Sequence, residues 1–205
     1  MSYTKKDLSV DYLIITGAPN SGKSTVVNIL TDIVENKRDE NEENLLVIED
    51  SIVDPIKAMV DVYDYSLLKN IKNDKNVRNL ICTVKNIMQT YAPDSLYYYI
   101  VEGVKFYYEG NLLPVINIRN PKDIDKCIDL LEVQGFRGKI INIVSDISVD
   151  ELANYPYDDR VAATGYFGKH LDKLVSIDNR NCSLEVLKER VKKFFFTLLT
   201  NKQGE

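Results

Sequence analysis

Residues 17–24 (GAPNSGKS) constrain the fold of this chain more than any other segment. They fit the pattern G-x-x-x-x-G-K-[ST] without departure. Residues 12–16 (YLIIT), directly before them, form an apolar, β-prone run that predicts a buried strand. Directly after them, apolar residues recur at helical spacing at Val26, Ile29, Leu30 and Ile33. A strand, a glycine-rich turn and a helix in this order predict a backbone loop that surrounds phosphate groups.

Each position of this loop has a chemical reason. Gly17 and Gly22 permit backbone angles that side chains forbid, so that successive N–H groups can point at phosphate oxygens. The start of the following helix adds its positive end. Lys23 is expected to reach the β- and γ-phosphates, and the Ser24 hydroxyl is expected to ligate magnesium. We therefore expect ATP with Mg²⁺ to be bound by Gly17, Ala18, Asn20, Ser21, Gly22, Lys23, Ser24 and Thr25.

Strand-like and helical segments alternate along the rest of the chain. Further strands are predicted at residues 45–48, 113–118, 139–144 and 174–177. Helical patterns fall in three pieces between residues 54 and 108, in one piece from 120 to 135, and in one from 183 to 199 with Leu184, Leu187, Val191, Phe194 and Leu198 inward. The polar segment 36–44 is predicted to be a loop, and residues 145–173 to be irregular. This order indicates a single domain, residues 1–205, with a three-layer α/β/α fold and a mainly parallel sheet of about five strands.

Several charged residues are expected near the phosphate loop, because ligands of parallel sheets bind outside the carboxyl ends of the strands. Arg119 directly follows one predicted strand, and Ser51, Asp54 and Lys57 follow another. Arg119 could neutralise charge on a transferring phosphoryl group, or pair with an acid at the surface. Asp54 could bind a ligand or cap its helix. Arg78 could bind an acceptor phosphate or lie exposed on its helix.

The acid that would help to hold magnesium is left open by the sequence. Many phosphate-loop enzymes place an aspartate at the end of a central strand, but here that place reads Asn117-Ile118-Arg119. Asp50 and Glu102 are two substitutes. The third alternative is a metal ion held by Ser24 and water alone.

Composition excludes several other classes of function. The net charge of −5 argues against a nucleic-acid partner, which would favour a basic face. Three separated cysteines and a single histidine, His170, fit neither a disulfide framework nor a multi-histidine metal site. No apolar run approaches the ~20 residues that a membrane span needs, and the N-terminal residues do not resemble a signal peptide. We expect a cytoplasmic protein with a small-molecule nucleotide substrate, and a homodimer is compatible with the sequence.

The chain resembles the nucleoside monophosphate kinase branch of phosphate-loop (P-loop) proteins, and especially the deoxynucleoside monophosphate kinase-like proteins of phages and bacteria. The loop ITGAPNSGKST carries the resemblance together with three weaker segments in the same order: SIVDPIKAM (51–59), VINIRNPKDID (115–125) and SIDNRNCSLEVLKERV (176–191). The resemblance implies ATP as phosphoryl donor and a (deoxy)nucleoside monophosphate as acceptor. It also implies a lid, here residues 146–170. Lids of this family usually carry several arginines, but this segment contains only Arg160. In addition, Asn117 stands where the family has an aspartate before the arginine that corresponds to Arg119.

The leading hypothesis is therefore a phosphotransferase. Lys23 and Arg119 would act on the transferring phosphoryl group, and the acceptor would be bound by Asp54, Lys57, Arg78 and Arg160 within the helical segment 51–110 and the lid. A P-loop ATPase or nucleotide-dependent switch that acts through a protein partner is the alternative, and a nucleotide-binding module without chemistry is the third. The sequence does not identify the acceptor base or sugar.

Overall fold

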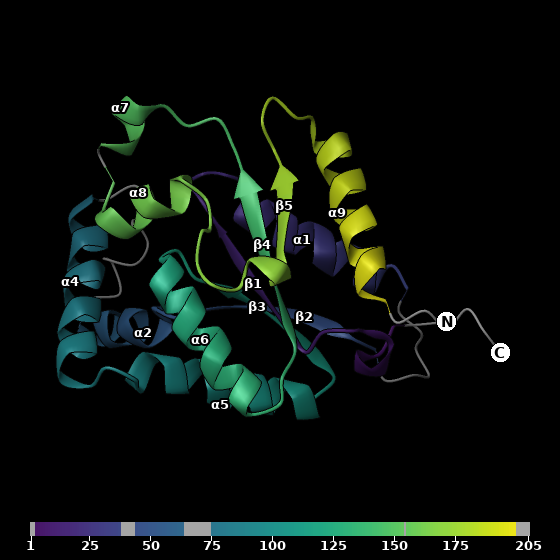
Figure 1. The fold of residues 1–205 in the computed structure, drawn as a ribbon, viewed down its shortest axis with the longest axis horizontal. Helices are drawn as coiled ribbons and strands as arrows, with labels where there is room; N and C mark the ends of the chain where they lie inside the picture. Colours follow the sequence, from purple (N-terminus) through teal and green to yellow (C-terminus); the bar gives the residue numbers. More distant parts are fainter. Residues whose placement is uncertain (1–2, 38–43, 64–74, 154, 200–205) are drawn as a thin grey trace.

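The computed structural model describes residues 3–37, 44–63, 75–153 and 155–199. Five parallel strands form one sheet in the order β2-β3-β1-β4-β5 (Figure 1). The strands are β1 (Tyr12–Gly17), β2 (Leu46–Ser51), β3 (Leu112–Asn117), β4 (Gly138–Val144) and β5 (Leu174–Asp178). All four strand pairings are parallel. The predicted three-layer α/β/α fold with a parallel sheet of about five strands is thus confirmed.

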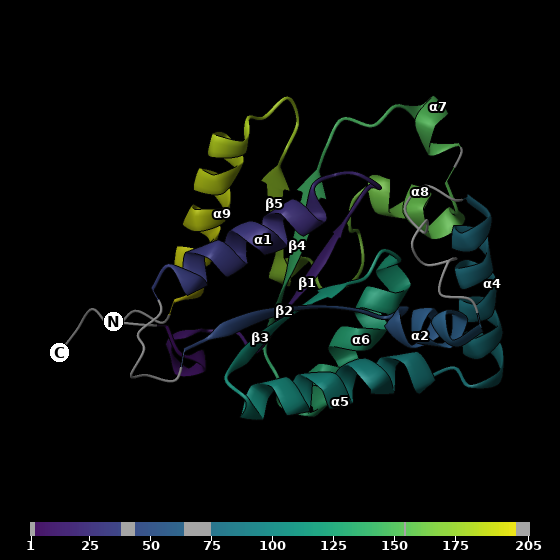
Figure 2. The ribbon, with the colours of Figure 1, turned by 180° about the vertical axis from the view of Figure 1, so that it is seen from behind.

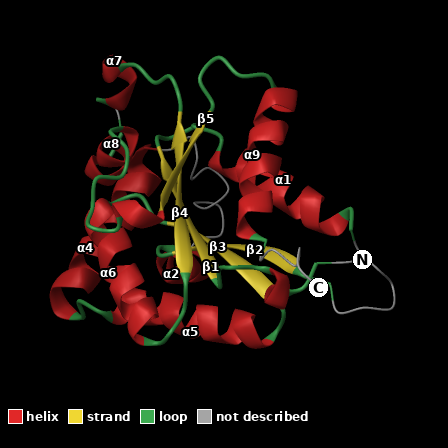
Figure 3. Ribbon diagram, turned by 45° about the vertical axis from the view of Figure 1, so that its right-hand side comes forward, coloured by secondary structure: helices red, strands yellow, loops and turns green. Residues whose placement is uncertain are grey.

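Helices cover both faces of the sheet. Helices α1 (Lys23–Glu35) and α9 (Leu184–Leu198) pack on one face, as Figure 2 shows from behind. The opposite face carries α2 (Asp54–Tyr63), α4 (Lys75–Tyr91), α5 (Ser95–Glu109) and α6 (Pro121–Val133). Figure 3 shows the sheet edge-on between the two layers of helices. Short elements complete the described chain: α7 (Val149–Leu152), α8 (Tyr157–Ala163) and the 3₁₀ turns Lys5–Asp7 and Leu171–Lys173.

The strand period explains why there are two hydrophobic cores. Successive side chains of a strand point to opposite faces, so a strand that is buried on both faces is apolar throughout. In β1, Leu13 and Ile15 pack with α1 and α9, whereas Tyr12 and Ile14 pack with α4, α5 and α6. The uninterrupted apolar run of this strand therefore follows from its central position.

The parallel arrangement brings the carboxyl ends of the strands to one edge of the sheet. The register pairs Gly17 with Ile143, and pairs both Ile15 and Ser51 with Asn117. The segments that follow β1, β2 and β3 consequently start side by side. This is the edge where the sequence predicted the phosphate loop and its neighbouring cations to meet.

Side-chain hydrogen bonds mark the starts of two of the predicted helices. The Asn120 side chain accepts a hydrogen bond from the Lys122 amide, and Ser183 caps α9 by accepting one from the Val186 amide. Two other predictions are wrong. Leu184, the first residue of α9, is 48% exposed, and Phe195 is buried in the core instead. Residues 145–173 are not irregular throughout, since they contain α7, α8 and a 3₁₀ turn.

The predicted loop at residues 36–44 lies mostly outside the described residues, as do residues 64–74 of the helical segment 51–110. Within the described parts of the chain, no helix combines the length and apolar character needed to cross a membrane.

Candidate functional site

The phosphate loop has the backbone geometry that its glycines predict. Gly17 has φ 139° and Gly22 has φ 96°, both in the region that side chains avoid. A Cβ atom at Gly17 would lie 2.6 Å from the carbonyl oxygen of Ile143, so only glycine fits there. The loop is braced from β5, because Asn179 Nδ2 donates to the Ser21 carbonyl at 2.9 Å. A backbone cradle of this kind fits a polyphosphate, whose oxygens accept from successive N–H groups.

Lys23 is buried at the start of α1 with its ammonium group turned toward the loop. Its Nζ donates to the carbonyl oxygens of Gly17 at 2.8 Å and Ala18 at 2.6 Å. Burial, together with the nearby positive charge of Arg119, lowers the pKa of Lys23 to about 7, while Glu49 opposes that shift. Lys23 thus forms no ion pair with a described side chain, and a phosphate group would supply an anion in direct contact.

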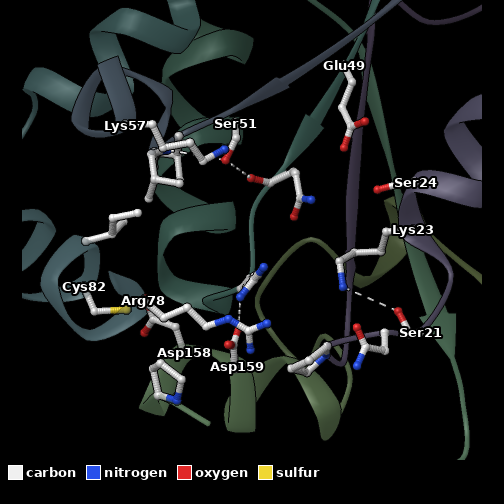
Figure 4. Close-up of a pocket in the computed structure, with 18 of the residues that line it drawn as sticks. Ser21, Lys23, Ser24, Glu49, Ser51, Lys57, Arg78, Cys82, Asp158 and Asp159 are labelled. Atoms are coloured by element: carbon white, nitrogen blue, oxygen red, sulfur yellow. Dashed lines mark hydrogen bonds and ion pairs between the residues drawn. The ribbon is translucent and has the colours of Figure 1, made fainter. Parts of the chain in front are cut away.

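A cavity of about 510 Å³ extends from the phosphate loop toward α2, α4 and α8 (Figure 4). We call it the site cavity. Its lining includes predicted site residues from four separate segments: Asn20, Ser21, Gly22, Lys23, Ser24, Thr25, Ser51, Lys57, Arg78 and Arg119. The fold therefore brings together residues that lie as much as about a hundred positions apart in the sequence.

Arg119 leaves the end of β3 and forms an ion pair with Asp159 of α8. The Arg119 side chain is partly exposed, whereas Asp159 is only 1% exposed. Burial and the positive charge of Arg78 both lower the pKa of Arg119. The predicted proximity of Arg119 to the phosphate loop is found, and so is the acidic partner that the alternative interpretation required.

A second cation, Lys85 of α4, reaches the site cavity within a buried network. Its Nζ lies 2.5 Å from Asp123 of α6 and 2.5 Å from Asp158 of α8. Burial acts to lower the pKa of Lys85, but the two carboxylates outweigh burial, and its pKa is raised. The same Asp123 accepts from the Tyr97 hydroxyl at 2.7 Å. Lys85 therefore joins three helices around the cavity as a permanently charged group.

The remaining predicted substrate-binding residues lie in different surroundings. Asp54 pairs with Lys57 at 2.5 Å one helical turn away, and only Lys57 lines the site cavity. The Arg78 guanidinium stacks over the Tyr155 ring at 5.1 Å. Arg160 is exposed on α8 and does not line the cavity. Gly17 and Ala18 lie outside the lining as well and contribute the carbonyl oxygens that hold Lys23.

Of the acids considered for magnesium, neither Asp50 nor Glu102 lines the site cavity. Asp50 is buried toward α5, where it accepts from the Tyr99 and Tyr107 hydroxyls, and burial raises its pKa. Glu102 is exposed and pairs with Lys105. Glu49 does line the cavity, and its carboxylate extends from β2 toward the Ser24 side of the loop (Figure 4).

Sequence reasoning missed the four charged lining residues Glu49, Lys85, Asp158 and Asp159. Strand alternation could have found Glu49, because it shares a strand face with Ser51, which was placed at the rim. Lys85 lies four residues after Ile81 on the apolar stripe of α4, and a lone cation on a buried face indicates a buried partner. The family resemblance implied a lid at residues 146–170, but no pattern in the sequence predicted the helix α8 within it or the acids that α8 brings to the cavity.

No family model matches the sequence, and no curated protein is similar to it in sequence. Among solved structures, the chain is similar to the protein APE1195, with 14% identity, a TM-score of 0.50, and coverage of 94% of this chain and 95% of that one. A structure from Chloroflexus aurantiacus titled "putative kinase" also matches, with 14% identity, a TM-score of 0.47, and coverage of 93% and 98%. At this identity the likeness concerns the fold. The comparison with APE1195 thus agrees with the three-layer α/β/α arrangement described above.

Proposed function

We propose that this protein is an ATP-dependent phosphotransferase of the nucleoside monophosphate kinase type, which transfers the γ-phosphoryl group of ATP to a (deoxy)nucleoside monophosphate. One observation carries the proposal: the phosphate loop shares a single cavity with four further cations, Lys57, Arg78, Lys85 and Arg119. A triphosphate alone would occupy the loop and its lysine. The additional positive charge on the far side of the cavity favours a second phosphorylated ligand.

On the donor side, the loop amides would bind the phosphates of ATP, and Lys23 would exchange its carbonyl partners for phosphate oxygens. Arg119 would hold the charge that spreads over the γ-phosphoryl oxygens during transfer. An oxygen of the acceptor phosphate attacks the γ-phosphorus, and the bond to the β-phosphate oxygen breaks to release ADP. Positioning and charge stabilisation are sufficient for this reaction, so no covalent enzyme intermediate is needed.

The residues of the site also fit magnesium. Ser24 and Glu49 line the same cavity and offer a hydroxyl and a carboxylate oxygen, the ligand types that Mg²⁺ prefers. These two residues would hold the ion directly or through water. When bound, magnesium neutralises phosphate charge. In this proposal Glu49, rather than Asp50 or Glu102, is the acid that helps to hold magnesium.

On the acceptor side, Lys57 and Arg78 flank an apolar wall made by Ile52, Val53 and Ile81. Two cations next to an apolar surface suit a ligand with a phosphate at one end and a flat base at the other. Residues 146–170, the lid implied by the resemblance, include the part of α8 that lines the cavity. Exclusion of water by this segment would favour transfer over hydrolysis.

The proposal is tested by a coupled assay of ADP release from MgATP across all common ribo- and deoxynucleoside monophosphates. We expect at least one acceptor to raise the rate well above the rate without acceptor. Arg78→Met should raise the acceptor KM more than the ATP KM, and Lys23→Met should abolish turnover. Lys188→Met, which removes an equal charge from the exposed face of α9, should leave the two KM values and the turnover unchanged.

ATP hydrolysis that is indifferent to every acceptor would reject the kinase and favour the ATPase or switch alternative. That alternative predicts a protein partner that is recovered only in the presence of nucleotide. Nucleotide binding that Lys23→Met removes, with no turnover in the native protein, would indicate the binding module.

A further inference from the structure

Residues 155–159, the loop before α8 and its first turn, contact the site cavity at several predicted ligand-binding groups. The Tyr155 hydroxyl accepts a hydrogen bond from the Asn20 amide at 3.4 Å, and the Tyr155 ring lies beneath Arg78. The Asp158 carboxylate accepts from Lys85 at 2.5 Å and from Asn120 Nδ2 at 2.9 Å. Asp159 pairs with Arg119. One short segment thus touches the phosphate loop and three of the cavity cations.

The chemistry of these contacts is that of phosphate binding. A carboxylate and a phosphate both accept hydrogen bonds from the planar guanidinium group, and they compete for it. Asp158 and Asp159 place two carboxylates, labelled in Figure 4, among the cations that a substrate phosphate would use. The described part of the lid therefore brings acids to the cavity where arginines were expected.

The arrangement around Asp159 is incompletely satisfied. One carboxylate oxygen pairs with Arg119, while the other is buried and has no hydrogen-bond partner among the described residues. A buried carboxylate oxygen without a donor costs free energy. An arrangement that carries this cost is easier to exchange for another than a fully satisfied one.

The elements that carry these acids are short. Helix α8 has seven residues, and its N-cap, Pro156, offers no side-chain hydrogen bond. The helix is joined to β4 and β5 through turns and short helices rather than through a strand of the sheet. Movement of α8 would thus leave the strand pairings of the sheet in place, although it would break the hydrogen bond between Tyr155 and Asn20 of the phosphate loop.

We propose that residues 155–159 form an acidic latch, which occupies the cavity cations in the absence of substrate and is displaced when a substrate phosphate binds Arg119. The inference rests on the proposed function in that it takes the cavity to be a phosphate site. Until the substrate binds, the latch would cover the site cavity, and its carboxylates would neutralise the charge of the cavity cations. Binding of phosphate and release of the two carboxylates from the cavity cations would be one coupled event, which leaves the segment free to cover the bound substrate.

A different role for Asp159, as a counter-ion that orients Arg119, predicts the opposite change in phosphate affinity when Asp159 is removed. If Asp159 served to orient Arg119 for the substrate, its removal would weaken phosphate binding. If Asp159 competes with the substrate, its removal strengthens binding. The sign of the change in affinity separates the two roles.

The test is titration calorimetry with inorganic tripolyphosphate and magnesium, which probes the phosphate site without any nucleoside. We expect Asp159→Asn to bind tripolyphosphate about tenfold more tightly than the native protein, as follows if about a tenth of the native molecules are unlatched. Asp172→Asn is the matched control, because Asp172 is exposed on the turn before β5 and lies outside the cavity. It should bind like the native protein.

A second measurement does not depend on a change at Asp159. The chain has no tryptophan, so Tyr157→Trp on the exposed side of α8 introduces a single tryptophan, whose emission can be excited selectively over that of the tyrosines. We expect its emission to shift when tripolyphosphate is added, and the double variant with Asp159→Asn to show the shifted emission beforehand.

Equal or weaker binding by Asp159→Asn, or an emission that tripolyphosphate leaves unchanged, would overturn the latch. Failure of the native protein to bind tripolyphosphate would overturn it as well. Acceptor-independent ATP turnover combined with tighter binding by Asp159→Asn would reject only the kinase and would support the latch.

Discussion

The buried Lys23 ammonium would make the proposed phosphate binding sensitive to pH, in a direction that follows from its lowered pKa. Its pKa is lowered to about 7 by burial and by Arg119, so at pH 8 only about a tenth of the free protein carries the charge. A bound polyphosphate favours the charged form and raises that pKa. Binding at pH 8 should therefore take up about 0.9 of a proton at this residue, compared with about 0.1 at pH 6.

Titration calorimetry in buffers of different ionisation enthalpy measures this uptake directly. The ligand is MgATP, and its own protons are removed by comparison with Lys23→Arg, in which the residue stays charged throughout. The difference between the native protein and the variant should be close to one proton at pH 8 and small at pH 6. Equal proton uptake by both proteins at pH 8 would refute the assignment of Lys23 as a neutralised cation that phosphate recharges.

Three further predictions concern stability and the phosphate loop, each with urea unfolding as the measurement. Gly17→Ala should lower the free energy of unfolding by about 2 kcal/mol and remove most of the ATP affinity, because φ is 139° and a carbonyl oxygen would lie 2.6 Å from the new Cβ. Gly135→Ala should lower the free energy of unfolding by about 1 kcal/mol and leave the ATP affinity unchanged, because φ is 85° but the space around it is open. Lys85→Met should lower the free energy of unfolding by about 3–5 kcal/mol, because it leaves two carboxylates without their cation. Lys57→Met should lower it by about 1 kcal/mol or less. The stability of Asp50→Asn relative to the native protein should increase as pH rises above about 4, because burial raises the pKa of Asp50 and its ionisation then costs the native protein stability. Equal pH profiles for the two proteins would contradict this.

The phosphate loop was predictable because the residues that determine its conformation lie close together in the sequence. Two glycines, a preceding apolar strand and a following amphipathic helix lie within about twenty residues, and the positive φ angles of Gly17 and Gly22 follow from that sequence alone. The position of Arg119 was predictable for a different reason. The topology of a parallel sheet brings strand ends together, so a residue that follows β3 lies near the loop that follows β1.

The rest of the cavity depends on contacts that sequence patterns do not encode. Asp158 meets Lys85 across 73 positions of the chain, and neither residue belongs to a motif. Periodicity also failed for the seven residues of α8, which are too few to establish a helical stripe. Asp50 and Glu102 were considered as the acid near the loop and Glu49 was not, because the facing of β2 was not followed residue by residue, although strand alternation separates Glu49 from Asp50.

Binding of two phosphorylated ligands in one cavity is tested most directly with a bisubstrate ligand, in which a chain of phosphates joins an adenosine to the nucleoside of the best acceptor. Its affinity should exceed that of ATP by about a hundredfold or more, because the second binding step becomes intramolecular. Inhibition should be competitive with both ATP and the acceptor. Affinity no greater than that of ATP, with competition against ATP alone, would contradict a shared donor and acceptor site.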